Sequence, residues 1–490
     1  MKLNKIYPLL FTLLILLVFT AAACDTLFGE GQGISTPTSQ IKTIHPATLT
    51  AISASADQAG TPGPDPVGIP WSDLDGLELE FWYVWDLDEP RKGMNAIVEK
   101  FNLENEYGIK VTAVNQGLTL DPMDSIETSF EDRVVPNVMI SDTLFLAGWY
   151  EMDLTVDLKV FMEDPAVGFS VAEWRDFYPG IIEPFKLNHD VRPGLPFTQN
   201  IQVLFYNQTW GEELGFSIPP GTSAELLEQA CAAVREYQGI SDGTSDGGGG
   251  LIIYPDSANI TSWIYAYKGT ILDTEEGKFQ FSSPEVTDFA LDWIGLGQEG
   301  CGYMISGYPD PMAQEIEFEK FNQRKALMIM NSSQNMDQIA LTANQTGQAD
   351  EWVMIPFPGP DGNKAVSSSI QSGVIFRSSP EEELASWIFL KYLTSPEMQK
   401  QWIQYSGSYP TRKDALYLLK EYQTDNPHWT QGINLLRYGM VDPLHPSWEI
   451  VRQAVGDAFE ALFGENPQDI SDLLLVLDQT AADLVKYSQE

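Results

Sequence analysis

Short apolar segments with strand character alternate with amphipathic helical segments from Trp71 onward, and this alternation limits the possible folds more than any other feature of the sequence. The first repeat runs from LELEFWYV at 77–84, through apolar positions with helical spacing between Met94 and Phe101, to IKVTAV at 109–114. A strand, a helix and a second strand thus fit within about 40 residues, which is enough for a parallel crossover. The pattern predicts an α/β fold in which helices cover parallel sheets.

The strong acidity of the chain excludes several classes of partner. The 490 residues include 28 Lys and Arg against 69 Asp and Glu, so the formal net charge is −41. No basic stripe is available to displace counterions from phosphates, which argues against binding to nucleic acid or to an anionic membrane surface. Because charged residues make up only 20% of the chain, we interpret the acidity as a surface property. The alternative is a cleft tuned for a cationic solute such as a polyamine.

The N-terminus has the pattern of an exported protein. Lys2 and Lys5 precede an apolar run at 7–20, and three alanines then lead to Cys24. This resembles the lipobox of a bacterial lipoprotein, which implies cleavage before Cys24, diacylation of its thiol and a place on the extracytoplasmic face of the cell membrane. Ala21 stands where that family usually has Leu, so an uncleaved membrane anchor is the alternative. No later stretch approaches the roughly 18 apolar residues that span a bilayer.

A linker and two cysteines follow from this export signal. Residues 25–70 are rich in Ser, Thr, Ala, Gly and Pro without a sustained apolar period, which predicts a flexible tether. With Cys24 assigned to lipid, Cys231 and Cys301 remain, and an extracytoplasmic protein can pair them. Cys231 also lies on the apolar face of a predicted helix, where it could simply pack. The sequence leaves both interpretations open.

Capping patterns mark the ends of several predicted helices. Ser-Pro-Glu begins two successive helices at Ser379 and Ser395, and it places acidic residues in their first turns, where the helix dipole favours them. A Ser-Pro pair at Ser283 opens another helix, and two helices are predicted in 447–490 with a break near 464–467.

Four segments resemble, in order, the family 1 extracellular solute-binding proteins of ABC importers. The stretch at 194–216 contains LFYNQ in the place of that family's strand-and-turn signature. FEKFNQRKALMIMNSSQ at 318–334 resembles its helix-to-strand step, and 387–415 resembles its most recognisable helix pair. HPSWEIVRQAV at 445–455 resembles the start of its C-terminal helix, so the likeness extends from about 75 to 490.

This resemblance implies a fold and a domain organisation. The expected fold is α/β, two-lobed and periplasmic-binding-protein-like (type II), with several inter-lobe crossings near 196–203, near 369–373 and in the low 430s. The implied segments are a signal peptide at 1–23, a lipidated Cys and linker at 24–70, lobe 1 at 71–198 plus 372–432, and lobe 2 at 199–371 plus 433–490.

The implied function is that of a membrane-tethered extracytoplasmic receptor. It captures a sugar or oligosaccharide in the cleft between the lobes and delivers it to the permease subunits of an ABC importer. The resemblance implies a monomer that performs no catalysis and needs no cofactor or metal. Binding would shift an equilibrium between open and closed lobes, because only the closed form contacts the solute from both sides.

The chemistry of a sugar site selects the candidate residues. Sugar rings stack on Trp or Tyr, and their hydroxyls need acceptors and forked donors such as Asp, Asn, Gln and Arg. Trp448 and Arg452 are one helical turn apart, so they share a helix face. The candidate ligand-binding residues are Trp85, Asp86, Asp88, Asp142, Gln199, Asn200, Tyr254, Asp256, Tyr409, Arg412, Trp448 and Arg452.

Other aromatic residues are expected in the core. This group is Trp82, Tyr83, Trp387 and Trp402, whereas Trp263 and Tyr265 fit a core or the cleft. The related family often places Gly-x-Trp after the strand near 326–330, but here Asn331 to Gln334 follow. The missing stacking platform favours a polar or differently shaped solute.

Enzymatic alternatives have weaker support. The G-x-S-x-G strings at 239–243 and 243–247 follow a helix instead of a strand, so a loop is favoured over a nucleophile elbow. The loop at 239–250 lacks the spacing of an EF-hand, and the 4 histidines are isolated in sequence. A glycoside hydrolase that uses two convergent carboxylates stays open as an alternative, as does a receptor that signals to a partner other than a permease.

Overall fold

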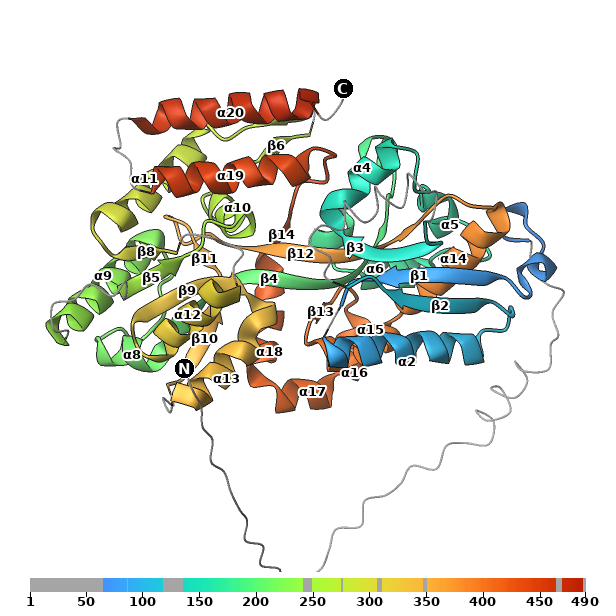
Figure 1. Cartoon of the computed structure of the whole chain (residues 1–490), viewed down its shortest axis with the longest axis horizontal. Helices are drawn as coiled ribbons and strands as arrows, with labels where there is room; N and C mark the ends of the chain where they lie inside the picture. The colour runs from blue at the N-terminus through green and yellow to red at the C-terminus, as the bar shows by residue number, and fades with distance from the viewer. Residues whose placement is uncertain are drawn as a thin grey trace, which may run out of the picture. The chain divides into compact units, whose positions relative to one another are not determined.

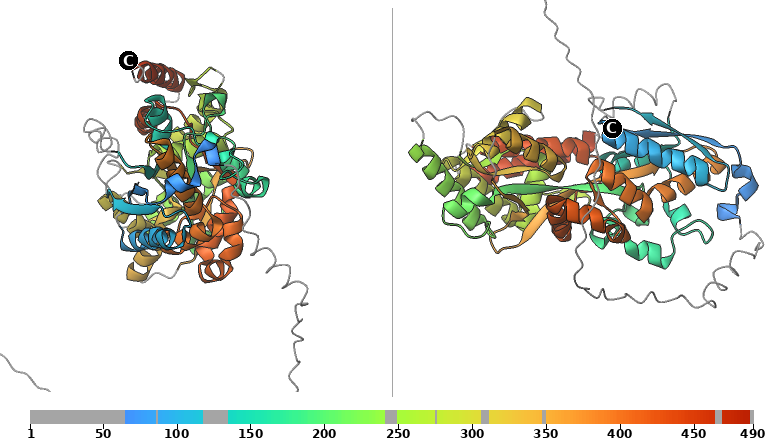
Figure 2. Two further views of the ribbon diagram at one scale, coloured as in Figure 1. Left: turned by 90° about the vertical axis from the view of Figure 1, so that its right-hand side faces the viewer. Right: turned by 90° about the horizontal axis from the view of Figure 1, so that it is seen from below.

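Two long strands form the middle of the fold and belong to both of its halves. In the computed structural model, β4 (Leu195–Asn207) and β12 (Lys364–Ile375) pair antiparallel, and they run from one group of helices to the other (Figure 1). The view from below shows β4 passing between the same two groups (Figure 2). We call these groups the first lobe, around β1 to β3, and the second lobe, around β5, β8 and β9.

The structure describes most of the chain after the predicted linker. Residues Pro62–Glu490 form one compact unit. The described residues are 65–85, 87–117, 135–240, 249–274, 276–305, 311–346, 350–463 and 469–487. No helix within these ranges is long and apolar enough to cross a membrane.

The first lobe is a sheet covered on both faces. Its strands and helices are β1 (Glu78–Tyr83), β2 (Lys110–Asn115), β3 (Val138–Asp142), α2 (Asp88–Glu104), α4 (Leu146–Glu151), α5 (Lys159–Met162), α6 (Val171–Asp176), α7 (Pro179–Ile182), α14 (Pro380–Leu393), α15 (Pro396–Ser406), β13 (Tyr409–Pro410) and α16 (Asp414–Leu418). β1 pairs parallel with β2 and β3, and α2 and α15 lie on the opposite side of this sheet from α4 (Figure 1).

The second lobe repeats this layering with more helices. Its elements are α8 (Gln208–Glu213), α9 (Ser223–Ile240), β5 (Gly249–Ile253), α10 (Ser257–Ala266), β6 (Leu272–Asp273), β7 (Lys278–Phe279), α11 (Pro284–Gln298), β8 (Gly302–Met304), α12 (Pro311–Asn322), β9 (Ala326–Ser332), α13 (Met336–Thr346), β10 (Trp352–Ile355), β11 (Phe357–Pro358), α17 (Lys420–Asp425), α18 (Pro427–Leu435), β14 (Gly439–Val441), α19 (Trp448–Leu462) and α20 (Ile470–Tyr487). β5 pairs parallel with β8 and β9.

One continuous sheet joins the lobes. Its strand order is β2-β1-β3-β12-β4-β9-β5-β8, and β10, β11, β13 and β14 pair at the sides of β4 and β12. The parallel strands of each lobe end toward the centre of the molecule, and open α/β sheets bind ligands at such carboxyl ends. The predicted crossings near 196–203 and 369–373 fall within β4 and β12. The third predicted crossing, in the low 430s, falls at the end of α18, and β14 then pairs parallel with β12.

Local sequence signals explain the helix boundaries. The Ser379 hydroxyl accepts from the backbone N–H of Glu382 at the start of α14, and Ser395 accepts from Met398 at the start of α15. α15 ends at Gly407, whose φ of 67° is the left-handed conformation that glycine adopts at low cost. The predicted helices that begin at Ser283, Ser379 and Ser395 are therefore confirmed.

The aromatic residues expected in the core are buried there. Trp387 and Trp402 are 0% and 1% exposed in the core of the first lobe. Trp263 belongs to the core of the second lobe, where its ring stacks on Phe289 with centroids 5.8 Å apart. Its neighbour Tyr265 is half-buried and donates to the carbonyl of Val441.

A disulfide closes one edge of the second lobe. Cys231 on α9 and Cys301, just before β8, are bonded across a sequence separation of 70 residues. Of the two interpretations that the sequence left open, the structure selects pairing. The covalent bond joins the helix to the edge of the β5–β8 sheet, and this restricts the unfolded chain more than the folded one.

Candidate functional site

A cavity of about 180 Å³ lies where both lobes meet the long strands. Its apolar walls include Leu144 and Phe185 from the first lobe and Leu444 from the segment between β14 and α19. Its polar lining consists of Asp142, Thr143, Gln202, Asp256, Ser257, Ser367, Ser368, Ser369, Asp442 and Arg452. The cavity therefore combines residues of the two lobes with the central strands between them.

Two of its carboxylates come from strand ends that the sequence analysis singled out. Asp142 ends β3, and its side chain accepts from the backbone N–H of Leu144 at 3.2 Å. Asp256 follows β5 and accepts from the N–H of Ala258 at 2.8 Å, which caps α10. Backbone N–H groups at a helix start stabilise a carboxylate, so both acids are held in place by the turn that follows their strand.

The third carboxylate, Asp442, was not among the predicted residues. It follows β14, and the Ser367 hydroxyl of β12 donates to its Oδ1 at 3.1 Å. Ser367 is itself positioned because its N–H donates to Ser262 on α10 at 2.8 Å. The signal that could have identified Asp442 is the one that identified Asp142 and Asp256: an aspartate directly after a short apolar strand.

Of the described residues that line the cavity, Arg452 supplies the only guanidinium. It projects from α19 and is half-buried. Among the described residues its Nε has no hydrogen-bond partner and its side chain makes no ion pair of 4.0 Å or less. A forked donor that the fold leaves without partners is available to a solute.

Burial sets the electrostatics of the three carboxylates. It raises the pKa of Asp142 and of Asp256, and the Arg452 charge and backbone hydrogen bonds offset this only in part. Burial also raises the pKa of Asp442 to about 6; the nearby Asp142 charge adds to this, whereas Trp448, Ser367 and Arg452 oppose it. Each carboxylate thus carries a desolvation cost that its protein partners do not fully compensate.

The aromatic candidates of the second lobe lie in the core and not in the cavity. Trp448 is 0% exposed, and its ring stacks on Phe279 with centroids 5.6 Å apart. Tyr254 is 2% exposed. Trp448 and Arg452 share α19 as predicted from their spacing, but only Arg452 reaches the cavity.

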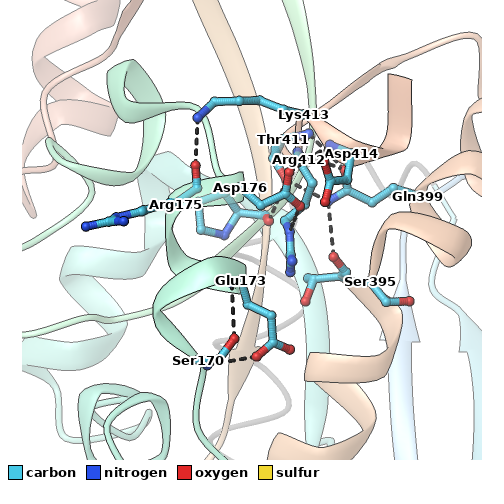
Figure 3. Close-up of polar contacts among 12 residues, drawn as sticks. Ser170, Glu173, Arg175, Asp176, Ser395, Gln399, Thr411, Arg412, Lys413 and Asp414 are labelled. Carbon is cyan, nitrogen blue, oxygen red and sulfur yellow. Dashed lines mark hydrogen bonds and ion pairs between the residues drawn. The ribbon is translucent and has the colours of Figure 1, made fainter. Parts of the chain in front are cut away.

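Tyr409 and Arg412 also lie in the protein interior. Arg412 is 4% exposed, and its Nε donates to Oδ2 of Asp176 at 2.6 Å (Figure 3). The other oxygen of Asp176 accepts from the N–H of Asp414 at 2.7 Å. Tyr409 is 0% exposed and pairs with Gln199 between β13 and β4. The hydrogen bonds of Asp176 to Arg412 and Asp414 hold the end of α6 against the segment that follows β13.

The remaining candidates surround the cavity at a distance or belong to the first lobe. Trp85 packs against Trp402 with ring centroids 4.2 Å apart, and the exposed Asp88 pairs with Arg91 on α2. Gln199 donates to the carbonyl of Pro410 at 2.8 Å. Asp86 lies outside the described residues, as does Cys24.

Asn200 lies next to the cavity. It is opposite the cavity residue Ser369 in the pairing of β4 with β12. Because alternate residues of a strand share a face, Asn200 points to the same side of β4 as Gln202, which lines the cavity. The structure therefore brings together Asp142, Asp256 and Arg452 of the predicted set and places Asn200 beside them.

The cavity carboxylates do not form a preformed metal site. Within the described part of the chain, one group of at least three His, Cys, Asp or Glu residues has its ligand atoms within 4.8 Å of one another, and it consists of Cys231, Glu299 and Cys301. Its cysteines are consumed by the disulfide. The loop at 239–250, which lacks the spacing of a calcium-binding EF-hand, falls largely on 241–248, and these residues lie outside the described ones.

A family model described as bacterial extracellular solute-binding protein matches residues 96–430 of the chain. This range includes most of both lobes. It contains Asp142 and Asp256, whereas Asp442 and Arg452 lie beyond its end. A search of the curated proteins found no match.

Solved structures of similar fold include three sugar-related proteins. The cyclic alpha-maltosyl-1,6-maltose binding protein of Arthrobacter globiformis is 18% identical, covers 84% of this chain and 99% of its own, and has a TM-score of 0.70. The sugar-binding protein MalE of Xanthomonas citri is 18% identical, covers 84% of this chain and 98% of its own, and has a TM-score of 0.70. An ABC substrate-binding protein of Listeria monocytogenes in complex with cycloalternan is 15% identical, covers 83% of this chain and 100% of its own, and has a TM-score of 0.64. At these identities the likeness establishes the two-lobed α/β fold, which confirms the predicted fold class.

Proposed function

Because the chain belongs to the bacterial extracellular solute-binding proteins, we propose that it captures a sugar in the cavity between its lobes and delivers it to an ABC importer. The solved structures of similar fold support the choice of solute class, since their names describe sugar-binding proteins. We further propose that the chain acts as a monomer and performs no chemistry on the solute.

The observation that carries this proposal is the origin of the cavity lining. Asp142 belongs to the first lobe, Asp256 and Arg452 belong to the second lobe, and Ser369 belongs to a strand that joins them. A solute that contacts both lobes binds the closed arrangement more tightly than the open one. Binding then shifts the population toward closure, which is a state that an importer can distinguish.

The chemistry of the lining fits a hydroxylated solute. Sugar hydroxyls donate to carboxylates and accept from guanidinium groups, and Asp256 and Arg452 offer both kinds of partner. The volume of about 180 Å³ is below the roughly 300–1,000 Å³ of typical ligand pockets. We therefore propose that one sugar unit is enclosed at a time.

A ligand screen on the full chain tests the function. The screen contains neutral and amine-bearing monosaccharides and disaccharides. We expect at least one of them to raise the melting temperature by several degrees at a concentration of 100 Kd, because binding to the folded state then adds about 2.7 kcal/mol to the free energy of unfolding. Mass spectrometry of the recovered solute should show it intact. Cleavage would favour the hydrolase alternative, and no response to any sugar would contradict the proposal.

A matched pair of variants locates the site. Asp256→Asn keeps an oxygen that can cap α10 but removes the charge, and we expect it to weaken sugar binding about tenfold through loss of a charge-assisted hydrogen bond. The control is Asp273→Asn, which makes the same change at the end of β6, where Asp273 accepts from the N–H of Glu276 outside the cavity lining. Equal affinity of both variants and the parent would remove Asp256 from the site.

The place of the protein in the cell is a separate proposal. We propose that Cys24 carries a lipid anchor, and that 25–70 connect it to the lobes. The support is the lysine, apolar run and alanine pattern before Cys24. Cys24→Ser should release the chain from the membrane fraction and abolish labelling by a radioactive fatty acid. Retention of the variant in the membrane would instead indicate an uncleaved apolar anchor.

A further inference from the structure

The ionisable groups that line the cavity do not balance. Within the described part of the lining, Asp142, Asp256 and Asp442 contribute three carboxylates, whereas Arg452 contributes the one cationic side chain. Ser368 and Ser369 of β12 add neutral hydroxyl groups to the lining. With every group in its ordinary charge state the lining is short of positive charge, and a bound neutral sugar would leave this deficit unchanged.

The missing positive charge is not supplied from elsewhere in the described structure. The pKa values of Asp142 and Asp256 are raised because burial outweighs the Arg452 charge and the backbone hydrogen bonds that oppose it. Among the residues that the structure describes, no lysine or histidine lines the cavity. Arg452 itself makes no ion pair with the described residues, so the acids and the guanidinium face the same space without neutralising one another at close range.

A bare metal ion does not fit this arrangement. The carboxylate oxygens of Asp142, Asp256 and Asp442 are not among the groups of ligand atoms that come within 4.8 Å of one another. The acids also come from three separate elements: the end of β3, the start of α10 and the residue after β14. An organic solute can place a charge near one of them while it contacts the others through different atoms.

The lining also lacks an exposed aromatic platform. Phe185 is the one aromatic residue among the described residues of the lining, and it is 2% exposed. Sugars that are held mainly through their C–H faces need an accessible ring. Recognition in this cavity must therefore depend on charge and hydrogen bonds more than on stacking.

We propose that the solute is a small amino sugar, with a protonated amine close to Asp142 and at most one of Asp256 and Asp442, a hydroxyl that donates to the remaining carboxylate, and hydroxyls that accept from Arg452. This inference rests on the proposed function and narrows its solute class. The ammonium group supplies the positive charge that the acids lack, and its donors can reach carboxylates from two different elements. The hydroxyls supply the acceptors that the partnerless Nε of Arg452 needs.

A polyamine fits less well than an amino sugar. Its successive ammonium groups would bring at least one positive charge close to Arg452, and in a cavity of about 180 Å³ the two cations could not avoid each other. It also offers no acceptor to the guanidinium or to the serine hydroxyls. Arg452 thus selects against a second cation, while the three acids select for the first.

Calorimetry of the full chain with matched sugar pairs tests the inference. The probes are D-glucosamine with D-glucose, D-galactosamine with D-galactose and D-mannosamine with D-mannose, which differ only in the replacement of one hydroxyl by an ammonium group. We expect the amine to bind at least tenfold more tightly in the pair whose stereochemistry fits, and we expect this ratio to fall at high salt. Spermidine should bind more weakly than the amino sugar.

The outcomes separate the two proposals. Tight binding of a neutral sugar, with no preference for its amine, would overturn the amino sugar and leave the sugar receptor intact. Binding of spermidine but of no sugar would overturn both. N-acetyl-D-glucosamine provides a further control, because acetylation removes the charge and should abolish the preference in the glucosamine pair.

Variants of the acids show whether the preference arises in this cavity. Asp142→Asn keeps an acceptor for the N–H of Leu144 and should reduce the ratio of amine to neutral affinity about tenfold, with less effect on the neutral sugar. Asp273→Asn, outside the lining, should leave the ratio unchanged. An unchanged ratio in Asp142→Asn would place the amine elsewhere and overturn the assignment.

Discussion

Arg412 and Arg452 are two arginines that face acids in different lobes, and the fold supplies one of them with partners and leaves the other without any. The Nε of Arg412 donates to Asp176 at 2.6 Å, and its guanidinium lies 4.7 Å from the ring centre of Phe177. The Nε of Arg452 has no partner among the described residues, although three carboxylates line the same cavity.

This difference distinguishes a structural charge from one that is available to a solute. A buried ion pair such as that of Arg412 with Asp176 holds its elements together, and breaking it leaves an uncompensated charge in the interior. A half-buried guanidinium without partners has paid part of its desolvation cost and gains from a solute that supplies acceptors. Both arginines were predicted as ligand contacts from the sequence. Their hydrogen-bond partners in the structure distinguish the structural arginine, Arg412, from the one available to a solute, Arg452.

The largest expected effect comes from breaking the Arg412 pair. Asp176→Ala leaves a buried guanidinium without its carboxylate, and we expect it to lower the free energy of unfolding by about 3–5 kcal/mol. Urea denaturation measures this loss. The control is Asp361→Ala, which breaks an exposed pair with Lys268 and should cost less than about 1 kcal/mol. Equal losses in both variants would contradict a structural role for Asp176.

Removal of the disulfide separates stability from binding. The double variant Cys231→Ser, Cys301→Ser should lower the free energy of unfolding by about 2–4 kcal/mol, because the unfolded chain regains the freedom of a long loop. Neither cysteine lines the cavity. Calorimetry below the melting temperature should therefore give the parental solute affinity, and a large loss of affinity would show that the second lobe needs this bond to hold its binding residues in place.

Arg452 should show the opposite behaviour to Asp176. Arg452→Met removes the guanidinium but keeps much of the apolar stem, and we expect solute affinity to fall about 10- to 100-fold through loss of charge-assisted hydrogen bonds. The free energy of unfolding should change by less than about 1 kcal/mol, because no described partner loses a hydrogen bond or close ion pair. A variant that unfolds easily but binds normally would reverse the comparison.

The fold could be predicted from the sequence because its signals are local. The strand predicted at 77–84 is β1 (Glu78–Tyr83), and the helix predicted from the apolar spacing near Met94 is α2. Ser379 and Ser395 cap their helices through atoms only a few residues away. Periodicity and capping contain the information for such elements, because the interactions that form them lie within one or two turns.

The site could be predicted only in part because its interactions join distant segments. Asp176 and Arg412 are 236 residues apart, so nothing near Arg412 shows that it is already paired. Asp442 escaped attention because β14 has 3 residues, too few for a visible strand period. Asp142 and Asp256 were identified because longer apolar strands precede them.

The smallest expected effect concerns the charge of Asp442. Its pKa is about 6 in the folded protein against an ordinary value of 3.8, so the folded state holds this proton at a pH where the unfolded state releases it. The contribution of Asp442 to stability therefore rises as pH falls from about 7 to 4 and is unfavourable above 6. Asp442→Asn should add about 1–2 kcal/mol to the free energy of unfolding at pH 8 and little at pH 4.

The same titration should appear in binding. As pH falls through 6, Asp442 becomes neutral beside Asp142, Arg452, Ser367 and Trp448, so the affinity for an amine-bearing solute should decrease in the parent and vary less in Asp442→Asn. Glu317→Gln is the control: Glu317 is fully buried with a raised pKa and lies outside the cavity lining. It should alter the pH dependence of stability and leave that of binding unchanged. If Asp442→Asn instead changed only stability, this carboxylate would belong with Asp176 among the structural charges, and the amine would have to lie against Asp142 and Asp256 alone.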